Sequence, residues 1–322
     1  MKTINFGKFR GMQRCTSDHG AMAVLALDHR NNLRRALNPA DPDNVTDHVM
    51  ENFKKDVTEA LAPNSSAVLL DPEVGAFQAI ASGKLPGSVG LIVALEATGY
   101  AGDSAARESR ILDSWSVQKI KRMGADAVKL LVYYHPDSPQ AHSIEELVHQ
   151  VAEESEREDI FYMLEPLTYS YKSGQGKLSG DEKKYAVTET ARRLAQFGAD
   201  ILKVEFPVDI QMVPDEADWV SGCSDLSAGI DIPWVLLSAS VDYETYLRQV
   251  AAACQGGASG VAVGRAVWKE AADFHADERR QFLSGEASQR MQAITALVNQ
   301  QAKPLSDFFS AATADSSAYK NY

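Results

Sequence analysis

Eight short apolar runs recur along the chain, and each is almost continuously hydrophobic instead of alternating between apolar and polar residues. Strands that are buried on both faces have this character. The runs are Ala23–Asp28, Ser66–Asp71, Gly90–Glu96, Ala127–Tyr134, Phe161–Pro166, Ile201–Pro207, Pro233–Ser240 and Gly260–Gly264. They predict the eight strands of a buried parallel sheet.

Helical patterns separate these runs. Apolar residues fall at every fourth position from Val45 to Leu61, and the same spacing links Tyr246 to Cys254. The segment 143–146 (SIEE) has the form of a capping box and predicts that a helix begins there. A further helical spacing covers Ala287–Gln301. Strands and helices therefore alternate along most of the chain.

The junctions on the two sides of each predicted strand differ. Helix-to-strand junctions are short, and three of them begin with glycine, at Gly124, Gly198 and Gly257, where a left-handed residue can end a helix. Strand-to-helix junctions are long and polar; they include Ala97–Asp113, Leu167–Asp181 and Val208–Asp231. Eight such units predict a TIM (β/α)8 barrel whose site lies at the carboxyl ends of the strands. A doubly wound open sheet shares the alternation, but it usually has fewer strands and often a glycine-rich first turn.

This pattern predicts an α/β protein with one barrel domain. The expected divisions are an N-terminal lead-in over residues 1–20, the barrel over residues 21–285, and a C-terminal helix with a loose tail over residues 286–322.

The charge balance narrows the classes of function. The 322 residues carry 32 Lys and Arg against 44 Asp and Glu, a net charge of −12, which disfavours binding to nucleic acid or to an anionic membrane. No apolar run approaches the ~18 residues of a membrane span, and the first residues do not resemble a secretory signal. Cys15, Cys223 and Cys254 are too far apart for a disulfide framework or a CxxC metal site. We expect a soluble cytoplasmic protein.

Ionisable residues stand at the carboxyl ends of the predicted strands, where a barrel mouth would gather them. They include Asp28, Asp71, Glu96, Lys129, Glu165, Lys203, Glu205 and Arg265. A desolvated lysine beside a second ammonium group has a lowered pKa and attacks ketones, and Glu165 could transfer the protons. Spacing alone does not decide between Lys129 and Lys203 as the nucleophile, and either could instead form an interior salt bridge.

The last two predicted strands favour a phosphate site, since barrel enzymes commonly bind phosphate there. Ser238, Ala239 and Ser240 offer hydroxyl and amide groups, Gly264 permits close approach, and Arg265 offers a bidentate fork. Metal chemistry is not expected, because only two of the seven histidines, His29 and His135, lie near strand ends. The loop Lys172–Lys177 lacks Walker spacing and is interpreted as a surface loop or lid.

The strand ends together resemble the class I tagatose 1,6-bisphosphate aldolases and the related sulfofructosephosphate aldolases. The motifs, in order from about residue 20 to residue 270, are ALDHR (26–30), LLDPE (69–73), EATGY (96–100), AVKLLVYY (127–134), LEPLTY (164–169), LKVEFP (202–207), LSAS (237–240) and GRAVW (264–268). The resemblance implies a TIM barrel and metal-free Schiff-base cleavage of a ketose bisphosphate. The products would be dihydroxyacetone phosphate and glyceraldehyde 3-phosphate, and the family is often oligomeric, so a homo-oligomer is expected.

The same resemblance implies a role for each site residue. The imine lysine of the family falls on Lys203, its acid–base glutamate on Glu165, its accessory lysine on Lys129 and its first-strand carboxylate on Asp28. The phosphate of the dihydroxyacetone half would contact Ser238, the amides of Ala239 and Ser240, Gly264 and Arg265. His29 and Arg30 would lie toward the other half of the substrate.

Three positions depart from the pattern of the family. This chain has His29 in place of Gln, Ala97 in place of Lys and Ser240 in place of Gly. They affect the identity of the substrate more than the type of reaction. Three alternatives stay open beside this reading: a sulfofructose phosphate substrate, a transaldolase reaction and a non-catalytic sugar-phosphate sensor.

Overall fold

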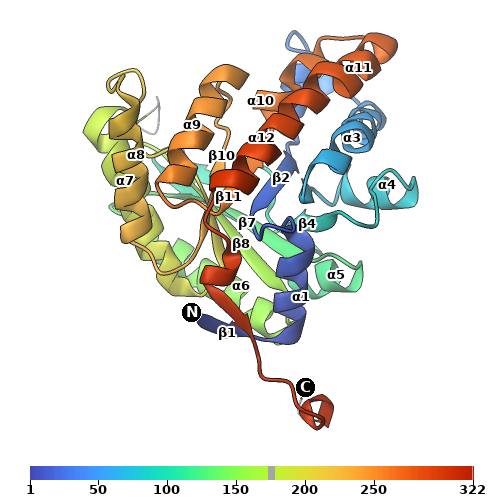
Figure 1. The fold of residues 1–322 in the computed structure, drawn as a ribbon. Helices are drawn as coiled ribbons and strands as arrows, with labels where there is room; N and C mark the ends of the chain where they lie inside the picture. The colour runs from blue at the N-terminus through green and yellow to red at the C-terminus, as the bar shows by residue number, and fades with distance from the viewer. Residues whose placement is uncertain (173–177, 321) are drawn as a thin grey trace.

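Eight parallel strands close into a barrel in the computed structural model, which describes residues 1–172, 178–320 and 322 (Figure 1). The strands are β2 (Met22–Leu27), β3 (Ala67–Leu70), β4 (Gly90–Ala94), β7 (Ala127–Tyr134), β8 (Phe161–Thr168), β9 (Ile201–Val204), β10 (Trp234–Leu237) and β11 (Gly260–Val263). They pair in this order, and the pairing of β11 with β2 completes the ring. The TIM barrel predicted from the sequence is confirmed.

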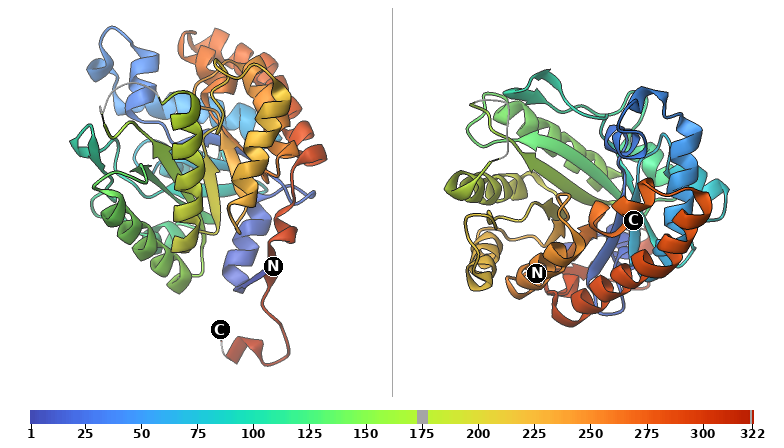
Figure 2. Two further views of the ribbon diagram at one scale, coloured as in Figure 1. Left: turned by 90° about the vertical axis from the view of Figure 1, so that its left-hand side faces the viewer. Right: turned by 90° about the horizontal axis from the view of Figure 1, so that it is seen from above.

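Helices surround the barrel (Figure 2). They are α2 (Asn31–Leu37), α3 (Asp47–Leu61), α4 (Ala76–Ala81), α5 (Val117–Arg122), α6 (Ala141–Arg157), α7 (Gly180–Leu194), α8 (Glu216–Ala228), α9 (Tyr243–Gln255), α10 (Arg265–Trp268), α11 (Ala276–Phe282) and α12 (Ser288–Gln301). Within the described part of the chain, no helix is long and apolar enough to cross a membrane. The helix predicted near Ala287–Gln301 is confirmed as α12.

Local chemistry explains where several helices begin and end. The Asp242 carboxylate accepts a hydrogen bond from the Thr245 amide at 2.9 Å and caps α9. Gly124, Gly198 and Gly257 have φ values of 93°, 91° and 100°, so the left-handed residues expected before the strands are confirmed.

The predicted capping box at Ser143–Glu146 is wrong. Helix α6 already begins at Ala141, because the turn before it is closed by a hydrogen bond from the Ser138 amide to the His135 carbonyl. Ser143 lies inside the first turn, and its hydroxyl donates to the Gln140 carbonyl at 2.9 Å. A serine that bonds back within its own turn cannot cap the helix.

The amino ends of the strands are covered by segments from both ends of the chain. Strand β1 (Lys2–Ile4) pairs in parallel with β12 (Phe309–Ala311), and α1 (Phe6–Cys15) packs beneath β4, β7 and β8. Lys8 in α1 forms a buried ion pair with Asp200 at 2.9 Å. Residues 309–311 of the C-terminal tail are ordered by this pairing with the lead-in.

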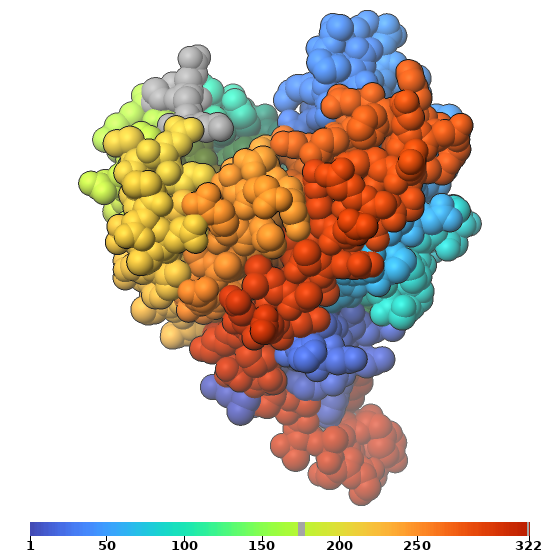
Figure 3. Space-filling model, turned by 45° about the horizontal axis from the view of Figure 1, so that its top comes forward, coloured from blue at the N-terminus to red at the C-terminus, as the bar shows by residue number. Residues whose placement is uncertain are grey.

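The alternation of side chains along each strand builds the mouth of the barrel. An apolar cluster fills the interior and includes Ala26, Ala127, Met163 and Ile201. Because side chains two residues apart point to the same side of a strand, the next inward positions form a layer above this cluster. That layer consists of Asp28, Lys129, Glu165 and Lys203. The other end of the barrel, where the strands have their carboxyl ends, is hollowed (Figure 3).

Candidate active site

A cavity of about 640 Å³ opens at the carboxyl ends of the strands. Its size suits a sugar phosphate. Asp28, Glu165 and Lys203 line it, whereas Lys129 lies below its floor with no exposed surface. The residues predicted to act together are therefore gathered at one place.

Two lysines share one carboxylate oxygen at the floor of the cavity. The ammonium nitrogen of Lys203 and that of Lys129 each lie 2.8 Å from Oε2 of Glu165. Both contacts are ion pairs, and neither is aligned as a hydrogen bond. Lys203 lines the cavity but is only 4% exposed, so its side chain is largely shielded from solvent. This arrangement places a proton-transfer group next to an amine.

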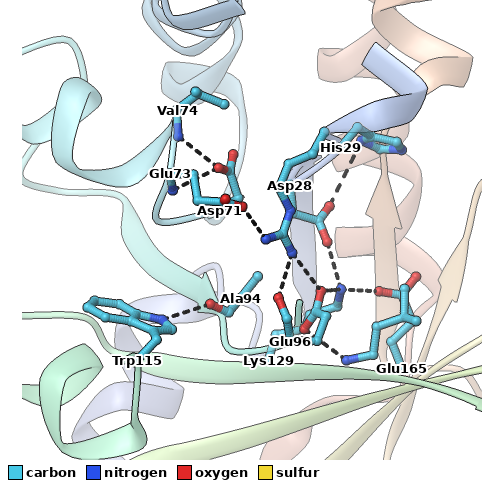
Figure 4. A network of polar contacts seen from close by, with 12 residues as sticks. Asp28, His29, Asp71, Glu73, Val74, Ala94, Glu96, Trp115, Lys129 and Glu165 are labelled. Atoms are coloured by element: carbon cyan, nitrogen blue, oxygen red, sulfur yellow. Dashed lines mark hydrogen bonds and ion pairs between the residues drawn. The ribbon is translucent and has the colours of Figure 1, made fainter. Parts of the chain in front are cut away.

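Three carboxylates surround Lys129 (Figure 4). Its Nζ lies 2.7 Å from Asp28 and 2.7 Å from Glu96, in addition to the contact with Glu165. Burial lowers the pKa of Lys129, but the three negative charges outweigh burial and hold the pKa well above its ordinary value. Lys129 is therefore fixed as an ammonium ion, which disfavours it as the nucleophile. Lys203, by contrast, forms an ion pair with Glu165 at the wall of the cavity.

The carboxylates respond to the same charges in the opposite sense. Burial raises the pKa of Glu165, yet the ammonium groups of Lys129 and Lys203 outweigh burial and hold the pKa below its ordinary value. The pKa of Asp28 is held well below its ordinary value by the same balance. Both groups are anionic in the free protein at neutral pH.

Glu96 is a member of this cluster to which the sequence assigned no role. Its carboxylate accepts from Lys129 through one oxygen and from the Leu131 amide at 3.0 Å through the other. The available signal was that Glu96 is the only ionisable residue of the apolar run Gly90–Glu96. Further cavity residues not singled out from the sequence are Asn31, Asn32, Arg35, Tyr133 and Leu167.

The ends of β10 and β11 form a separate corner of the cavity. Ser238, Ala239, Gly264 and Arg265 line it, and the Gly264 amide donates to the Ser238 hydroxyl at 3.3 Å. Within the described chain, no hydrogen bond or ion pair holds the Arg265 guanidinium. Burial lowers the pKa of Arg265, and the charge of Asp28 acts against this effect. A guanidinium that no side chain of the described residues engages is suited to an anion.

Ser240 stands apart from this corner. It is exposed, does not line the cavity and has a φ of 63°, next to Ala239 at 37°. A left-handed backbone costs an ordinary residue about 1–2 kcal/mol, whereas glycine adopts it freely. The departure from the family at this position therefore places strain in the turn after β10.

His29 lies beside the β11 corner and not across the cavity from it. Its ring contacts Trp268 edge-on at 5.3 Å between centroids, and a side chain at Gly264 would meet the ring. Burial lowers the pKa of His29 to about 3, so the imidazole is neutral. Arg30 is buried and engaged by Glu73 at 2.5 Å and by the Glu96 carbonyl at 2.7 Å.

The long junction after β4 contributes a wall to the cavity. It folds into a hairpin of β5 (Ala101–Asp103) and β6 (Ala106–Glu108). Arg107 of this hairpin lies 4.6 Å from the ring centres of both Tyr100 and Tyr169. Among the described residues, no three His, Cys, Asp or Glu side chains are arranged to hold a metal ion. Most of the predicted loop Lys172–Lys177 lies outside the described residues.

Comparisons with known proteins agree with this geometry. Residues 22–270 match the model of the DeoC/LacD family aldolases. The chain belongs to this family. It is therefore an aldolase, a carbon–carbon lyase.

Two relatives of this aldolase cover nearly its whole length. It is 32% identical to a tagatose 1,6-diphosphate aldolase of Listeria innocua, over 94% of this chain and 95% of the relative. It is 30% identical to tagatose 1,6-diphosphate aldolase 2 of Streptococcus pyogenes, over 94% and 98%. Among solved structures, an archaeal fructose 1,6-bisphosphate aldolase has a TM-score of 0.59 at 22% identity, covering 90% of this chain and 98% of that one. The structural likeness shows a shared fold.

Proposed function

We propose that this aldolase cleaves tagatose 1,6-bisphosphate to dihydroxyacetone phosphate and glyceraldehyde 3-phosphate through an imine on Lys203. The observation that carries the proposal is the single carboxylate oxygen of Glu165 between Lys203 and Lys129. Lys129 is held as an ammonium ion by three carboxylates, which leaves Lys203 as the amine placed to attack a ketone.

The ammonium group of Lys203 gives a proton to Glu165, and the free amine attacks C2. Glu165 returns the proton as the carbinolamine loses water and becomes an iminium ion. Once the C4 hydroxyl gives its proton to Glu165, which is a carboxylate again after the dehydration, the C3–C4 bond breaks and its electron pair flows to the iminium nitrogen. The aldehyde leaves, the enamine is protonated at C3, and water hydrolyses the resulting imine. Asp28 orients the hydroxyl groups, Lys129 acts through its contact with Glu165, and no metal ion takes part.

The phosphate on C1 would bind at the corner formed by Ser238, Gly264 and Arg265. The names of the Listeria and Streptococcus relatives support a ketose bisphosphate as the substrate. The net charge of −12 does not oppose an anionic substrate, because Lys203 and Arg265 face the cavity. Local charge, rather than the total, governs binding at a partly enclosed site.

Replacing Arg265 with methionine is expected to raise the KM for the ketose bisphosphate by about 10- to 100-fold, with a smaller change in kcat. A charge-assisted hydrogen bond to phosphate contributes about 1.5–3 kcal/mol, and this one is made to substrate and transition state alike. Arg265→Lys should recover part of the affinity. Steady-state kinetics of the three proteins test this, and an unchanged KM in Arg265→Met would place the phosphate elsewhere.

The identity of the substrate is tested by product analysis. The enzyme is supplied in turn with tagatose 1,6-bisphosphate, fructose 1,6-bisphosphate and sulfofructose 1-phosphate, each with and without an acceptor aldehyde. The proposal predicts that kcat/KM is highest for tagatose 1,6-bisphosphate. It also predicts that dihydroxyacetone phosphate is released as a product when no acceptor aldehyde is present. Preference for the sulfonate would identify a sulfofructosephosphate aldolase. Product that forms only with an acceptor would identify a transaldolase, and binding without turnover would identify a sensor.

A further inference from the structure

A continuous set of polar contacts leads from helix α3 to the reacting lysine, and Figure 4 shows the part of it between Asp71 and Glu165. Lys54 of α3 forms a buried ion pair with Asp71 at the end of β3. The other oxygen of Asp71 accepts hydrogen bonds from the amides of Glu73 and Val74, each at 2.9 Å. These contacts fix the turn after β3, and with it the backbone of Glu73.

The second half of the set runs through Arg30. Its Nη1 donates to the Glu73 carboxylate at 2.5 Å, and its Nη2 donates to the Glu96 carbonyl at 2.7 Å. The Glu96 carboxylate in turn bonds Lys129 at 2.7 Å, and Lys129 contacts Glu165 beside Lys203. Arg30 thus joins the turn after β3 to the residue that holds Lys129.

Arg30 and Arg265 both line the cavity, but only the charge of Arg30 is already paired with a carboxylate. Both amino groups of Arg30 are occupied, and its side chain is 8% exposed. The Glu73 carboxylate already compensates its charge and the side chain is largely covered, which disfavours a phosphate as a further partner. No hydrogen bond or ion pair in the described chain engages the Arg265 guanidinium, which is open to an anion. The resemblance implied that Arg30 lies toward the distal half of the substrate. Its contacts with Glu73 and Glu96 favour a role in holding these two residues in place.

We propose that Arg30 is a positioning residue: it fixes Glu96, which holds Lys129 against Glu165, and it does not bind the distal group of the substrate. Glu73, whose side chain is partly exposed to solvent, orients Arg30 through their ion pair. This inference rests on the proposed aldolase reaction. Loss of Arg30 loosens the carboxylate cage around Lys129, which alters proton transfer at Glu165 and so acts on kcat.

The test compares the ketose 1,6-bisphosphate with the matching ketose 1-phosphate, which lacks the distal phosphate. Arg30→Met is expected to lower kcat by about 10- to 100-fold on both substrates, the effect of losing one charge-assisted contact. The ratio of the two KM values should change by less than about threefold, since distal binding is untouched. Arg30→Lys keeps the charge and should recover part of kcat on both.

Glu73→Gln supplies a second variant, because the Glu73 side chain is 47% exposed and its replacement leaves the fold intact. It should lower kcat on both substrates in the same direction as Arg30→Met, and by less. The matched control is Glu216→Gln. It breaks an exposed ion pair with Arg248, 2.6 Å long, whose residues do not line the cavity, and it should leave kcat unchanged.

A rise of about tenfold or more in KM for the bisphosphate alone, with kcat and the 1-phosphate unaffected, would overturn the proposal and make Arg30 a distal ligand. An unchanged kcat in Glu73→Gln and Arg30→Met would also overturn it. Failure of the proposed function is distinguishable, because the wild-type protein would then cleave neither substrate.

Discussion

Replacing Lys129 with methionine is expected to lower the free energy of unfolding by about 3–5 kcal/mol, because the change leaves carboxylates buried without their cation. Asp28, Glu96 and Glu165 all lie within 2.8 Å of the Lys129 nitrogen. The same change should lower kcat by at least about 100-fold, since Glu165 loses one of its two ammonium partners. Urea unfolding and steady-state kinetics measure the two effects.

The pH dependence of this variant has a definite sign. Lys129 is the foremost charge that lowers the pKa of Glu165 and of Asp28. Without it both values rise, so the acidic limb of the kcat/KM profile should move to higher pH. In the wild type, carboxylates with depressed pKa values stabilise the fold above their unfolded pKa values and lose this contribution as pH falls through the folded values.

The matched control is Lys84→Met, which breaks an exposed ion pair with Glu59. Its effect on unfolding should stay below about 1 kcal/mol, and kcat should not change. Equal stability and equal activity of Lys129→Met and the wild type would contradict the structural account of the cluster.

Replacing Lys203 with methionine is expected to lower kcat/KM by at least about 10⁴-fold, because the covalent route through the imine is closed. The fold should tolerate this change better than the loss of Lys129. Lys203 contacts one carboxylate at the cavity wall, and that carboxylate keeps its contact with Lys129. Circular dichroism and thermal unfolding would show that the variant is folded. Turnover within about tenfold of the wild type would remove Lys203 from the role of nucleophile.

The sequence predicted the barrel because its physical causes are local. Buried parallel strands must be apolar on both faces, and glycine closes helices where the backbone turns left-handed, as at Gly198. The lysines and carboxylates of the mouth were also predictable, since an ionisable residue at the end of an apolar strand needs a polar partner. The family resemblance, and not the spacing, distinguished Lys203 from Lys129.

Contacts between distant segments were not predictable in this way. That Arg30 would bond Glu73 and Glu96 depends on how three loops meet above the barrel, and residue types alone do not report this. The strand Phe309–Ala311 forms because it pairs with β1, which lies more than 300 residues away in the chain, at the amino ends of the barrel strands. The Ser143 motif failed for a local reason, since an earlier turn at Ser138 had already started the helix.

The most direct test of the account is to trap the imine. The protein is incubated with dihydroxyacetone phosphate, reduced with borohydride, digested and mapped by mass spectrometry. The account predicts a three-carbon phosphate adduct on Lys203, formed only when the ketone is present. No adduct, or an adduct on Lys129 or another lysine, would contradict it.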